Sequence, residues 1–386
     1  MTAMEKNNKT LNVPHLRFPE FSGEWEKTSI GDCCSDLEYG MNAASKNFDG
    51  VNKYIRITDI DELTAEYKQD SLVSPDALLE DKYLIKDGDI LFARTGASTG
   101  KTYIYAPQDG KLYYAGFLIR ANVNFGTNPK FVFYQTQTHR YKKWVSIMSM
   151  RSGQPGINSQ EYASYQFWKP TKEEQDKISD LITLLDQRIK TQKKIIEKYD
   201  SLIRGLYHSI FNNPSSNYYL QLREVVSVVK GKQVNGEELF EEGKYYVMNG
   251  GTEPSGYLNE YNTPADTISI SEGGNSCGYV QYNKEPFWSG GHCYSLMPKS
   301  ENIYYRFLYH FLKYKENDIM ALRIGSGLPN IQKKDIERFE VQLPSFERQI
   351  EVTTLLDTIS AKRDLERQLN HVWQSQKKYL LGGIFI

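Results

Sequence analysis

An internal duplication is the feature that most constrains the fold of this chain. When the sequence is shifted by 174 residues against itself, two loops fall into register without a gap. Residues 152–158 read S-G-Q-P-G-I-N, and residues 326–332 read S-G-L-P-N-I-Q. The same shift pairs identical residues, namely Asn128 with Asn302, Phe133 with Phe307, Pro170 with Pro344, Glu173 with Glu347, Gln175 with Gln349 and Leu181 with Leu355. Since Gly and Pro at turns are chosen by backbone geometry, this pattern indicates two copies of one structural unit.

The duplication continues upstream of these loops with a looser match. Residues 89–101 read D-I-L-F-A-R-T-G-A-S-T-G-K, and residues 267–278 read T-I-S-I-S-E-G-G-N-S-C-G. Both segments predict a short apolar strand that runs into a Gly-rich turn. We therefore expect each half to contain strands, a Gly turn, further strands, a helix, the Ser-Gly-x-Pro loop and a long helix, in that order.

A heptad repeat marks the long helix of the first half. Its seam positions alternate in steps of four and three, and only Gln192 among them is polar; the apolar ones are Ile178, Ile182, Leu185, Ile189, Ile196, Tyr199, Ile203, Leu206 and Ile210. This spacing is typical of a coiled coil. The helix should begin near Thr171 and end before Asn212-Asn213-Pro214, which makes a rod of roughly 60 Å at about 1.5 Å per residue.

The second long helix should begin after Pro344-Ser345, and its apolar pattern is less regular. We place Leu355, Ile359 and Leu369 on its seam, but the register slips after Ile359, where Arg363 and Glu366 interrupt it. A rod with one apolar seam needs a partner, and the helix of the other half is the obvious one. The alternative is two amphipathic helices that pack on separate domain cores, although such helices usually show a broader apolar stripe.

The composition is that of a globular protein, and the net charge does not decide its partners. The chain has 386 residues, with 39% hydrophobic and 25% charged residues and a formal net charge of −1, which still permits a local basic patch for DNA. Cys33, Cys34, Cys277 and Cys293 lack C-x-x-C spacing and predict a reducing cytoplasm. No signal peptide and no apolar run of about 18 residues is evident, so we expect a cytoplasmic protein without a membrane span.

Several motifs that could carry chemistry are incomplete. Residues 96–102 resemble a phosphate-binding loop, but only three residues separate the glycines, and residues 102–107 predict a strand where that loop requires a helix. The acids Asp76, Glu80 and Asp81 predict a solvated turn. The sequence lacks a methyltransferase cofactor loop, an H-E-x-x-H motif and a G-x-S-x-G elbow. We expect no catalytic centre and no metal site in this chain.

Basic and polar loops are the features that fit DNA, because Arg and Lys neutralise phosphates and Arg, Gln and Asn also pair with base edges. In the first half the candidate DNA-binding residues are Arg94, Ser98, Thr99, Lys101, Arg140, Lys142, Lys143, Arg151 and Gln154. In the second half they are Lys230, Lys232, Gln233, Asn235, Arg323, Lys333 and Lys334. One such cluster is more often a solvated face, but recurrence in both halves favours DNA binding.

The chain resembles the specificity subunits of type I restriction–modification enzymes. The resemblance covers essentially the whole chain and rests on three stretches. They are residues 14–25, P-H-L-R-F-P-E-F-S-G-E-W; the strand and Gly turn at 89–101; and the helix start at 170–178, P-T-K-E-E-Q-D-K-I, which recurs at 344–352 as P-S-F-E-R-Q-I-E-V.

This resemblance implies a mixed α+β fold with a pseudo-two-fold internal repeat. Two strand-rich target-recognition domains, residues 1–170 and 215–343, would alternate with helical spacers at 171–214 and 344–386. The spacers would pair as an antiparallel two-helix coiled coil. Each domain would read one half of a bipartite site in double-stranded DNA, and the coiled coil would set the gap between the halves.

The resemblance also implies a non-catalytic subunit of a larger enzyme. Its partners would be two adenine methyltransferase subunits, docked on the coiled coil, and two restriction subunits that combine motor and nuclease. S-adenosylmethionine, ATP and magnesium would be bound by those partners. Three alternatives stay open: a fused nuclease–methyltransferase, a coiled-coil scaffold that binds protein or sugar, and the recognition subunit of a related system that cuts on both sides of its site.

Overall fold

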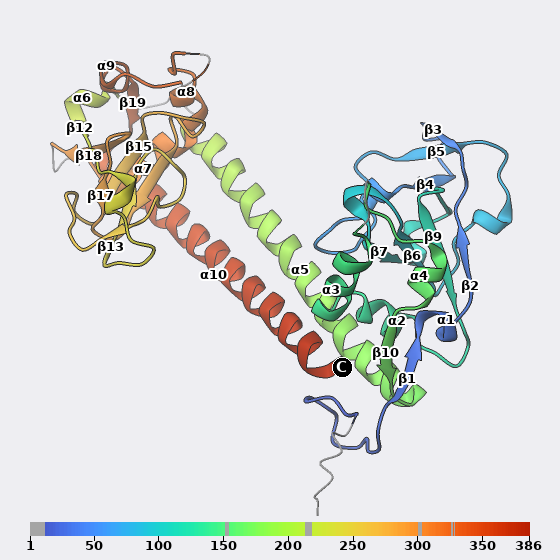
Figure 1. Cartoon of the computed structure of the whole chain (residues 1–386). Helices are drawn as coiled ribbons and strands as arrows, with labels where there is room; N and C mark the ends of the chain where they lie inside the picture. Colours follow the sequence, from blue (N-terminus) through green and yellow to red (C-terminus); the bar gives the residue numbers. More distant parts are fainter. Residues whose placement is uncertain (1–11, 151–153, 213–217, 300–302, 326, 328) are drawn as a thin grey trace, which may run out of the picture. The chain divides into compact units, whose positions relative to one another are not determined.

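The chain divides into two compact units, each of which contains part of both long helices. The computed structural model describes residues 12–150, 154–212, 218–299, 303–325, 327 and 329–386. Unit 1 comprises residues 1–191 and 369–386, and unit 2 comprises residues 192–368 (Figure 1). Of the residues singled out in the sequence, Arg151, Ser152, Gly153, Asn213, Pro214, Asn302, Ser326 and Leu328 lie outside the described residues.

Unit 1 combines short strands with short helices. Its strands are β1 (Glu26–Ser29), β2 (Cys34–Tyr39), β3 (Ala44–Asn47), β4 (Lys53–Ile55), β5 (Val73–Asp76), β6 (Asp89–Ala93), β7 (Thr102–Ile104), β8 (Leu112–Tyr114), β9 (Leu118–Val123) and β10 (Gln166–Lys169). Its helices are α1 (Ile30–Cys33), α2 (Pro129–Gln135), α3 (His139–Met148), α4 (Ser159–Ala163), the first half of α5 (Lys172–Phe211) and the end of α10 (Phe346–Ile384). Its 3-10 turns are η1 (Ile57–Asp59), η2 (Asp81–Tyr83), η3 (Gly96–Ser98) and η4 (Pro107–Asp109).

Unit 2 repeats this order of elements. Its strands are β11 (Tyr218–Gln221), β12 (Val226–Lys230), β13 (Tyr245–Met248), β14 (Tyr257–Leu258), β15 (Thr267–Ser271), β16 (Val280–Asn283), β17 (Trp288–Ser289), β18 (Cys293–Pro298) and β19 (Glu340–Leu343). Its helices are α6 (Leu222–Val225), α7 (Tyr305–Tyr314), α8 (Glu316–Met320), α9 (Lys333–Glu337) and the remaining parts of α5 and α10, and its 3-10 turn is η5 (Gly236–Glu238).

The four-stranded sheets of the two units have the same strand order, which confirms the predicted repeat, whereas β3 pairs with β5 in unit 1 and β14 joins β13 in unit 2. Each unit has a four-stranded antiparallel sheet, in the order β2-β9-β6-β7 in unit 1 and β12-β18-β15-β16 in unit 2. Each also has an antiparallel pair beside the long helix, β1-β10 or β11-β19, and a parallel pair, β4-β8 or β13-β17. The predicted apolar strands are β6 and β15, and both are buried along their whole length.

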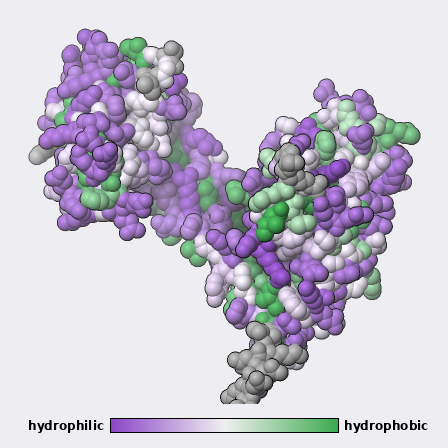
Figure 2. Space-filling model, viewed as in Figure 1, coloured by the Kyte–Doolittle hydropathy of each residue, from purple (hydrophilic) through white to green (hydrophobic). Residues whose placement is uncertain are grey.

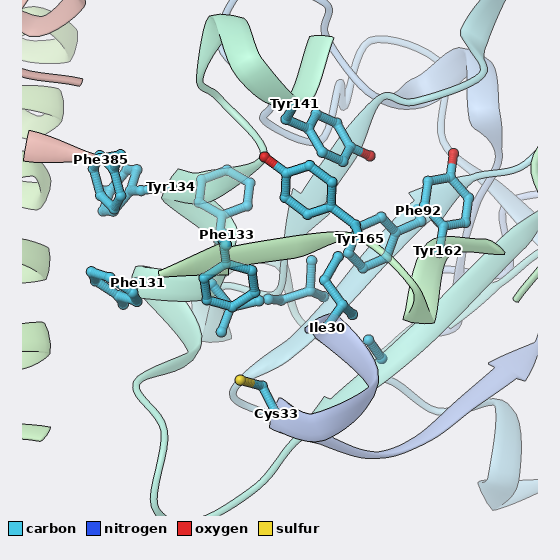
Figure 3. Close-up of a cluster of buried hydrophobic side chains, with 14 of the residues drawn as sticks. Ile30, Cys33, Phe92, Phe131, Phe133, Tyr134, Tyr141, Tyr162, Tyr165 and Phe385 are labelled. Carbon is cyan, nitrogen blue, oxygen red and sulfur yellow. The ribbon is translucent and has the colours of Figure 1, made fainter. Parts of the chain in front are cut away.

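Aromatic side chains fill the core of unit 1, which Figure 3 shows in close-up. Phe92 of β6 packs on Tyr162 at 4.9 Å between ring centroids, and Tyr141 packs on Tyr165 at 5.2 Å. Phe385, just beyond the end of α10, reaches this core and lies 5.3 Å from Phe131 of α2. The last turn of α10 is therefore part of the folded core of unit 1.

The core of unit 2 is closed in the equivalent way by the end of α5. Phe211 precedes Phe385 by the repeat shift of 174 residues. Its ring lies 5.6 Å from the ring of Phe307 and 5.6 Å from that of Phe311, both in α7, and 5.3 Å from that of Tyr314. Each long helix thus begins in one unit and ends in the core of the other.

The two long helices run antiparallel within each unit. In unit 1 Lys377 of α10 bonds to Asp186 of α5. In unit 2 Arg367 lies 3.0 Å from Asp200, and Gln192 Nε2 donates to the backbone oxygen of Glu366 at 3.3 Å. Gln192 and Glu366 are themselves 174 residues apart, so equivalent positions of the repeat contact each other. Helix α5 spans Lys172–Phe211, which confirms the predicted start and end of the first helix.

The seam of α5 follows the predicted heptads. Its most buried members are Ile178, Ile182, Leu185, Ile203 and the polar Gln192. The remaining predicted positions are half-buried, namely Ile189, Ile196, Tyr199, Leu206 and Ile210.

The prediction for the seam of α10 is wrong at Leu355 and one position off at Leu369, where the seam runs through residue 370. The Leu355 side chain is 45% exposed, whereas its neighbour Leu356 is fully buried, and Ile359 and Leu369 are half-buried. Leu356 is the residue that lies 174 positions after the buried Ile182. The seam positions of α10 that are buried or half-buried follow steps of four and three without a slip. They are residues 352, 356, 359, 363, 366, 370, 373, 377 and 380. The apparent slip arises because polar residues occupy the middle of this seam.

Candidate nucleic-acid interface

In unit 1 the Gly turn after β6 is held by the loop that follows α3. The backbone N–H of Gly96 donates to the carbonyl of Pro155 at 2.9 Å, and the N–H of Ile157 donates to the carbonyl of Arg94 at 2.9 Å. Thr99 closes the turn by donating from its hydroxyl to the carbonyl of Gly96 at 2.8 Å. The two polar segments singled out in the sequence therefore form one surface.

Unit 2 repeats the two backbone hydrogen bonds that join these segments. The N–H of Gly274 donates to the carbonyl of Pro329 at 3.0 Å, and the N–H of Ile331 donates to the carbonyl of Glu272 at 2.9 Å. Glu272 thus occupies the position of Arg94, directly before the Gly turn. The predicted match between the two Gly turns is confirmed, while the side chains that they carry differ.

The Gly turns lead into strands, as the sequence predicts, and not into helices. Residues Thr102–Ile104 form β7, and residues Val280–Asn283 form β16. Gly100 and Gly278 end the turns with φ angles of +88° and +93°, which favour glycine. A Cβ on Gly278 would also lie 2.8 Å from the Cα of Met320, so the turn packs directly on α8.

A second Gly-containing turn lies beside the first in each unit. Gly40 follows β2, and a Cβ there would lie 2.3 Å from the carbonyl oxygen of Ala115. Gly231 follows β12, and its Cβ would lie 2.2 Å from the carbonyl oxygen of Gly290. Such contacts with backbone atoms exclude every residue type except glycine. Because both glycines make this close approach, Gly40 and Gly231 are equivalent positions of the repeat. The residues that precede them, Tyr39 and Lys230, are then equivalent as well.

We expect Gly231→Ala to remove DNA binding by unit 2 and to lower stability by at least about 2 kcal/mol, because the added methyl group collides with backbone that cannot move away. Thermal melting and DNA binding of the full chain measure both effects. The matched control is Gly236→Ala, where a Cβ meets no atom within 4 Å. If Gly231→Ala and Gly236→Ala had the same melting temperature and the same DNA affinity, the close backbone approach at Gly231 would be contradicted.

In unit 1 the two turns bring Arg94 and Tyr39 together. The guanidinium carbon of Arg94 lies 4.7 Å from the centre of the Tyr39 ring. The Tyr39 hydroxyl accepts from the backbone N–H of Ser159 at 3.2 Å and also bonds to its side chain at 3.2 Å. Burial alone would raise the pKa of Tyr39, but these bonds and the charge of Arg94 outweigh it and lower the pKa. Tyr39 is therefore a fixed platform for the cation.

In unit 2 the equivalent positions hold an ion pair. Lys230 Nζ lies 2.6 Å from Glu272 Oε1, which also accepts from the Tyr294 hydroxyl at 3.0 Å. His292 Nδ1 lies 3.6 Å from Glu272 Oε2. Burial and the bond to Glu272 raise the pKa of Tyr294, so its hydroxyl keeps its proton and donates it. The Glu272 side chain is only 11% exposed, whereas that of Lys230 is 54% exposed.

The other candidates of unit 1 lie around the same turn or on α3. Ser98 is half-buried in η3, Lys101 pairs with Glu62 at 3.4 Å, and Gln154 is exposed above Gly96. Helix α3 packs its Val145 against Gly100. The basic residues of α3 are all exposed; they are Arg140, Lys142 and Lys143.

The other candidates of unit 2 are more scattered. Lys232 is fixed through its backbone, which donates to Ser289 at 2.8 Å, and Gln233 is exposed beside Gly291. Asn235 bonds away from the turn to Glu238 at 2.8 Å. Three further candidates are exposed, namely Arg323, Lys333 and Lys334, and Lys333 pairs with Glu337 at 3.6 Å. All of these residues remain predictions as DNA contacts.

Sequence reasoning missed Tyr39, Glu272 and His292. Tyr39 lies before segments that differ in length in the two halves, between β2 and β6 and between β12 and β15, so no constant shift aligns it with Lys230. Glu272 and His292 are not basic loop residues of the kind that the prediction selected. The glycines at 40 and 231 were the signal that could have aligned the strands before them. Figure 2 shows that the visible surface of each unit is mainly hydrophilic, with scattered hydrophobic residues. Within the described residues, no helix is both long and apolar enough to cross a membrane.

Comparison with proteins of known sequence gives matches along the whole chain. A specificity subunit of the type I restriction enzyme MjaVIII, from Methanocaldococcus jannaschii, is 22% identical over 98% of this chain and 95% of its own length. A protein of Mycoplasma genitalium named as a type I specificity subunit is 28% identical, over 50% of this chain. That match spans about half, 54%, of the Mycoplasma protein.

Solved structures share the fold. The S subunit of a type I restriction–modification system from Mycoplasma genitalium superposes with a TM-score of 0.73 at 21% identity and covers 97% of this chain and 99% of its own. A chain from a structure described as showing complex assembly and conformational transition of the type I system gives a TM-score of 0.55 at 16% identity and covers 92% of this chain and 96% of its own.

The profile of the family described as "Type I restriction modification DNA specificity domain" matches twice, at residues 22–198 and 214–372. The two matches include the two strand-rich parts and most of both long helices. The chain therefore belongs to the type I restriction modification DNA specificity domain family and carries two copies of that domain.

Proposed function

We propose that this chain is the DNA-recognition subunit of a type I restriction–modification complex and that each unit reads one half of a bipartite site in double-stranded DNA. The observation that carries the proposal is the duplicated surface, in which the same two glycine-dependent turns present a cation in both units, the half-buried Arg94 in unit 1 and the exposed Lys230 in unit 2. Glycine there lets backbone approach a ligand closely, and Arg or Lys there can reach base edges. The two copies of the family domain support the same function.

We propose that the long helices set the gap between the half-sites and dock two adenine methyltransferase subunits. Exposed apolar residues on α10 support docking, because Leu365, Val372 and Tyr379 are spaced by whole heptads and are 64%, 57% and 68% exposed. Two restriction subunits would complete the complex. The reactions belong to these partners, which would bind S-adenosylmethionine, ATP and magnesium. We place the complex in the cytoplasm, where the four buried free cysteines would stay reduced.

The test is to co-express the chain with the methyltransferase encoded beside it and to map methylated adenines across the host genome. We expect one bipartite motif, methylated once on each strand. If the two proteins co-purify and methylate adenine without any shared motif, the chain does not supply specificity and the proposal fails.

Exchange of one unit tests whether the two readers are independent. Replacing residues 218–340 with the same domain of a relative should change one half of the motif and leave the other half and the gap unchanged, since the exchanged strands and turns belong to unit 2. The methylation map measures this directly. A change in both halves would contradict independent reading.

A further inference from the structure

Two equivalent side-chain positions in each unit lie at the centre of the candidate interface. The first is the residue that precedes the close-approach glycine, Tyr39 in unit 1 and Lys230 in unit 2. The second is the residue that precedes the Gly turn, Arg94 or Glu272. Their equivalence rests on matching backbone bonds, because the N–H of Arg94 donates to Phe117 at 3.0 Å and that of Glu272 donates to His292 at 2.9 Å.

The two positions hold one cation and one support in both units, but with exchanged roles. In unit 1 the second position carries the cation, Arg94, and the first carries its support, Tyr39. In unit 2 the first position carries the cation, Lys230, and the second carries its support, Glu272. The side chains differ in kind, yet each pair delivers a positioned N–H donor to the same place in the repeat.

Each support is itself held in place. Tyr39 is fixed by the two bonds from Ser159, and Glu272 is buried and bonded to Tyr294. A donor that is oriented before binding loses less side-chain entropy when it meets a ligand. The surroundings are open to solvent, because the neighbouring Phe117 is 59% exposed and the His292 side chain is 60% exposed.

The chemistry of both pairs favours a base edge over a phosphate. The Tyr39 ring restricts the movement of the Arg94 guanidinium, whose N–H groups can donate to the two coplanar acceptors O6 and N7 of guanine. Glu272 offsets the positive charge that Lys230 would offer to a phosphate, while the ammonium protons that do not bond to Glu272 can still donate to the same acceptors.

We propose that Arg94 and Lys230 are the equivalent specificity-determining residues of the two units, each reading a guanine in its own half-site, with Tyr39 and Glu272 as positioning residues. This inference rests on the proposed DNA-recognition function. It adds the base class that is read in each half and the residues that read it.

The experiment selects duplexes from a randomised pool with the full chain bound to its methyltransferase, and compares the wild type with Arg94→Gln and Lys230→Gln. We expect Arg94→Gln to lose the preference for guanine at one position of one half-site, with roughly 10- to 100-fold weaker binding of the original motif. Lys230→Gln should do the same at one position in the other half. All other positions should keep their preference.

Three control variants separate base reading from other roles. Arg140→Gln, in the exposed basic face of α3, should weaken all sequences alike and reduce the salt dependence, as a phosphate contact does. Tyr39→Ala should weaken the guanine preference although Arg94 is present, and Tyr39→Phe, which keeps the ring but loses the bonds from Ser159, should restore part of it. Thermal melting of every variant reports whether the altered unit is folded, unit 1 for the changes at 39, 94 and 140 and unit 2 for the change at 230.

The outcomes are distinguishable. If the wild type selects a motif and Arg94→Gln and Lys230→Gln keep it, or lose affinity for all sequences equally, the base assignment is overturned and the proposed function stands. If the wild type selects no motif at all, the proposed function fails and the assignment fails with it.

Discussion

Inserting one heptad into each long helix, beside Gln192 in α5 and beside Glu366 in α10, is expected to lengthen the gap of the recognised site by about three base pairs. Seven residues add roughly 10 Å of helix, and one base pair occupies about 3.4 Å. Both half-sites should stay unchanged, because the strands and turns of each unit are untouched. The boundary between the units falls in both helices, between 191 and 192 and between 368 and 369. Both insertions are therefore needed.

A whole heptad preserves the seam on either side of the insertion, whereas other lengths rotate one part of the helix against its partner. Insertion into α5 alone should instead destabilise the protein, since α10 would no longer match it. The control places seven residues after Glu242, in an exposed loop of unit 2, and should leave the gap as it is. Methylation mapping measures the gap. An unchanged gap together with intact methylation would refute the role of the helices as a spacer.

Truncating Phe211 to alanine is expected to destabilise unit 2 by about 3–5 kcal/mol, because the residue is buried among four aromatic rings and its removal leaves a cavity. Hydrogen exchange resolves the two units, so peptides from β15 and α7 should exchange faster while those of β6 change little. Phe385→Ala should produce the reverse pattern, since that ring packs in the core of unit 1.

The control for this truncation is Leu202→Ala on the same helix. Leu202 is 48% exposed, so its loss should cost less than about 1 kcal/mol. Comparable destabilisation by Phe211→Ala and Leu202→Ala would show that the end of α5 is not part of the core. Urea unfolding of the three variants gives the free energies directly.

The seam of α10 shows where sequence patterns stop being sufficient. Leu355 and Leu356 are both apolar, and periodicity over a few residues fits either one. Burial selects Leu356, which matches Ile182 in the first copy. The middle of the seam is polar, and Glu366 there contacts another polar residue, Gln192. Along the sequence, this break in the apolar pattern looks like a loss of register. A pattern based only on apolar residues does not detect such a pair.

The sequence by itself determined the duplication, the strands and Gly turns of each copy, and the bounds of α5. These features depend on neighbouring residues, through turn geometry, alternation and heptad spacing, and so they are visible along the chain. Only the tertiary structure decided that Tyr39 supports Arg94 and that Glu272 supports Lys230. The strands that carry these residues are far apart in the chain and become neighbours through the order of the sheet, which no local pattern encodes.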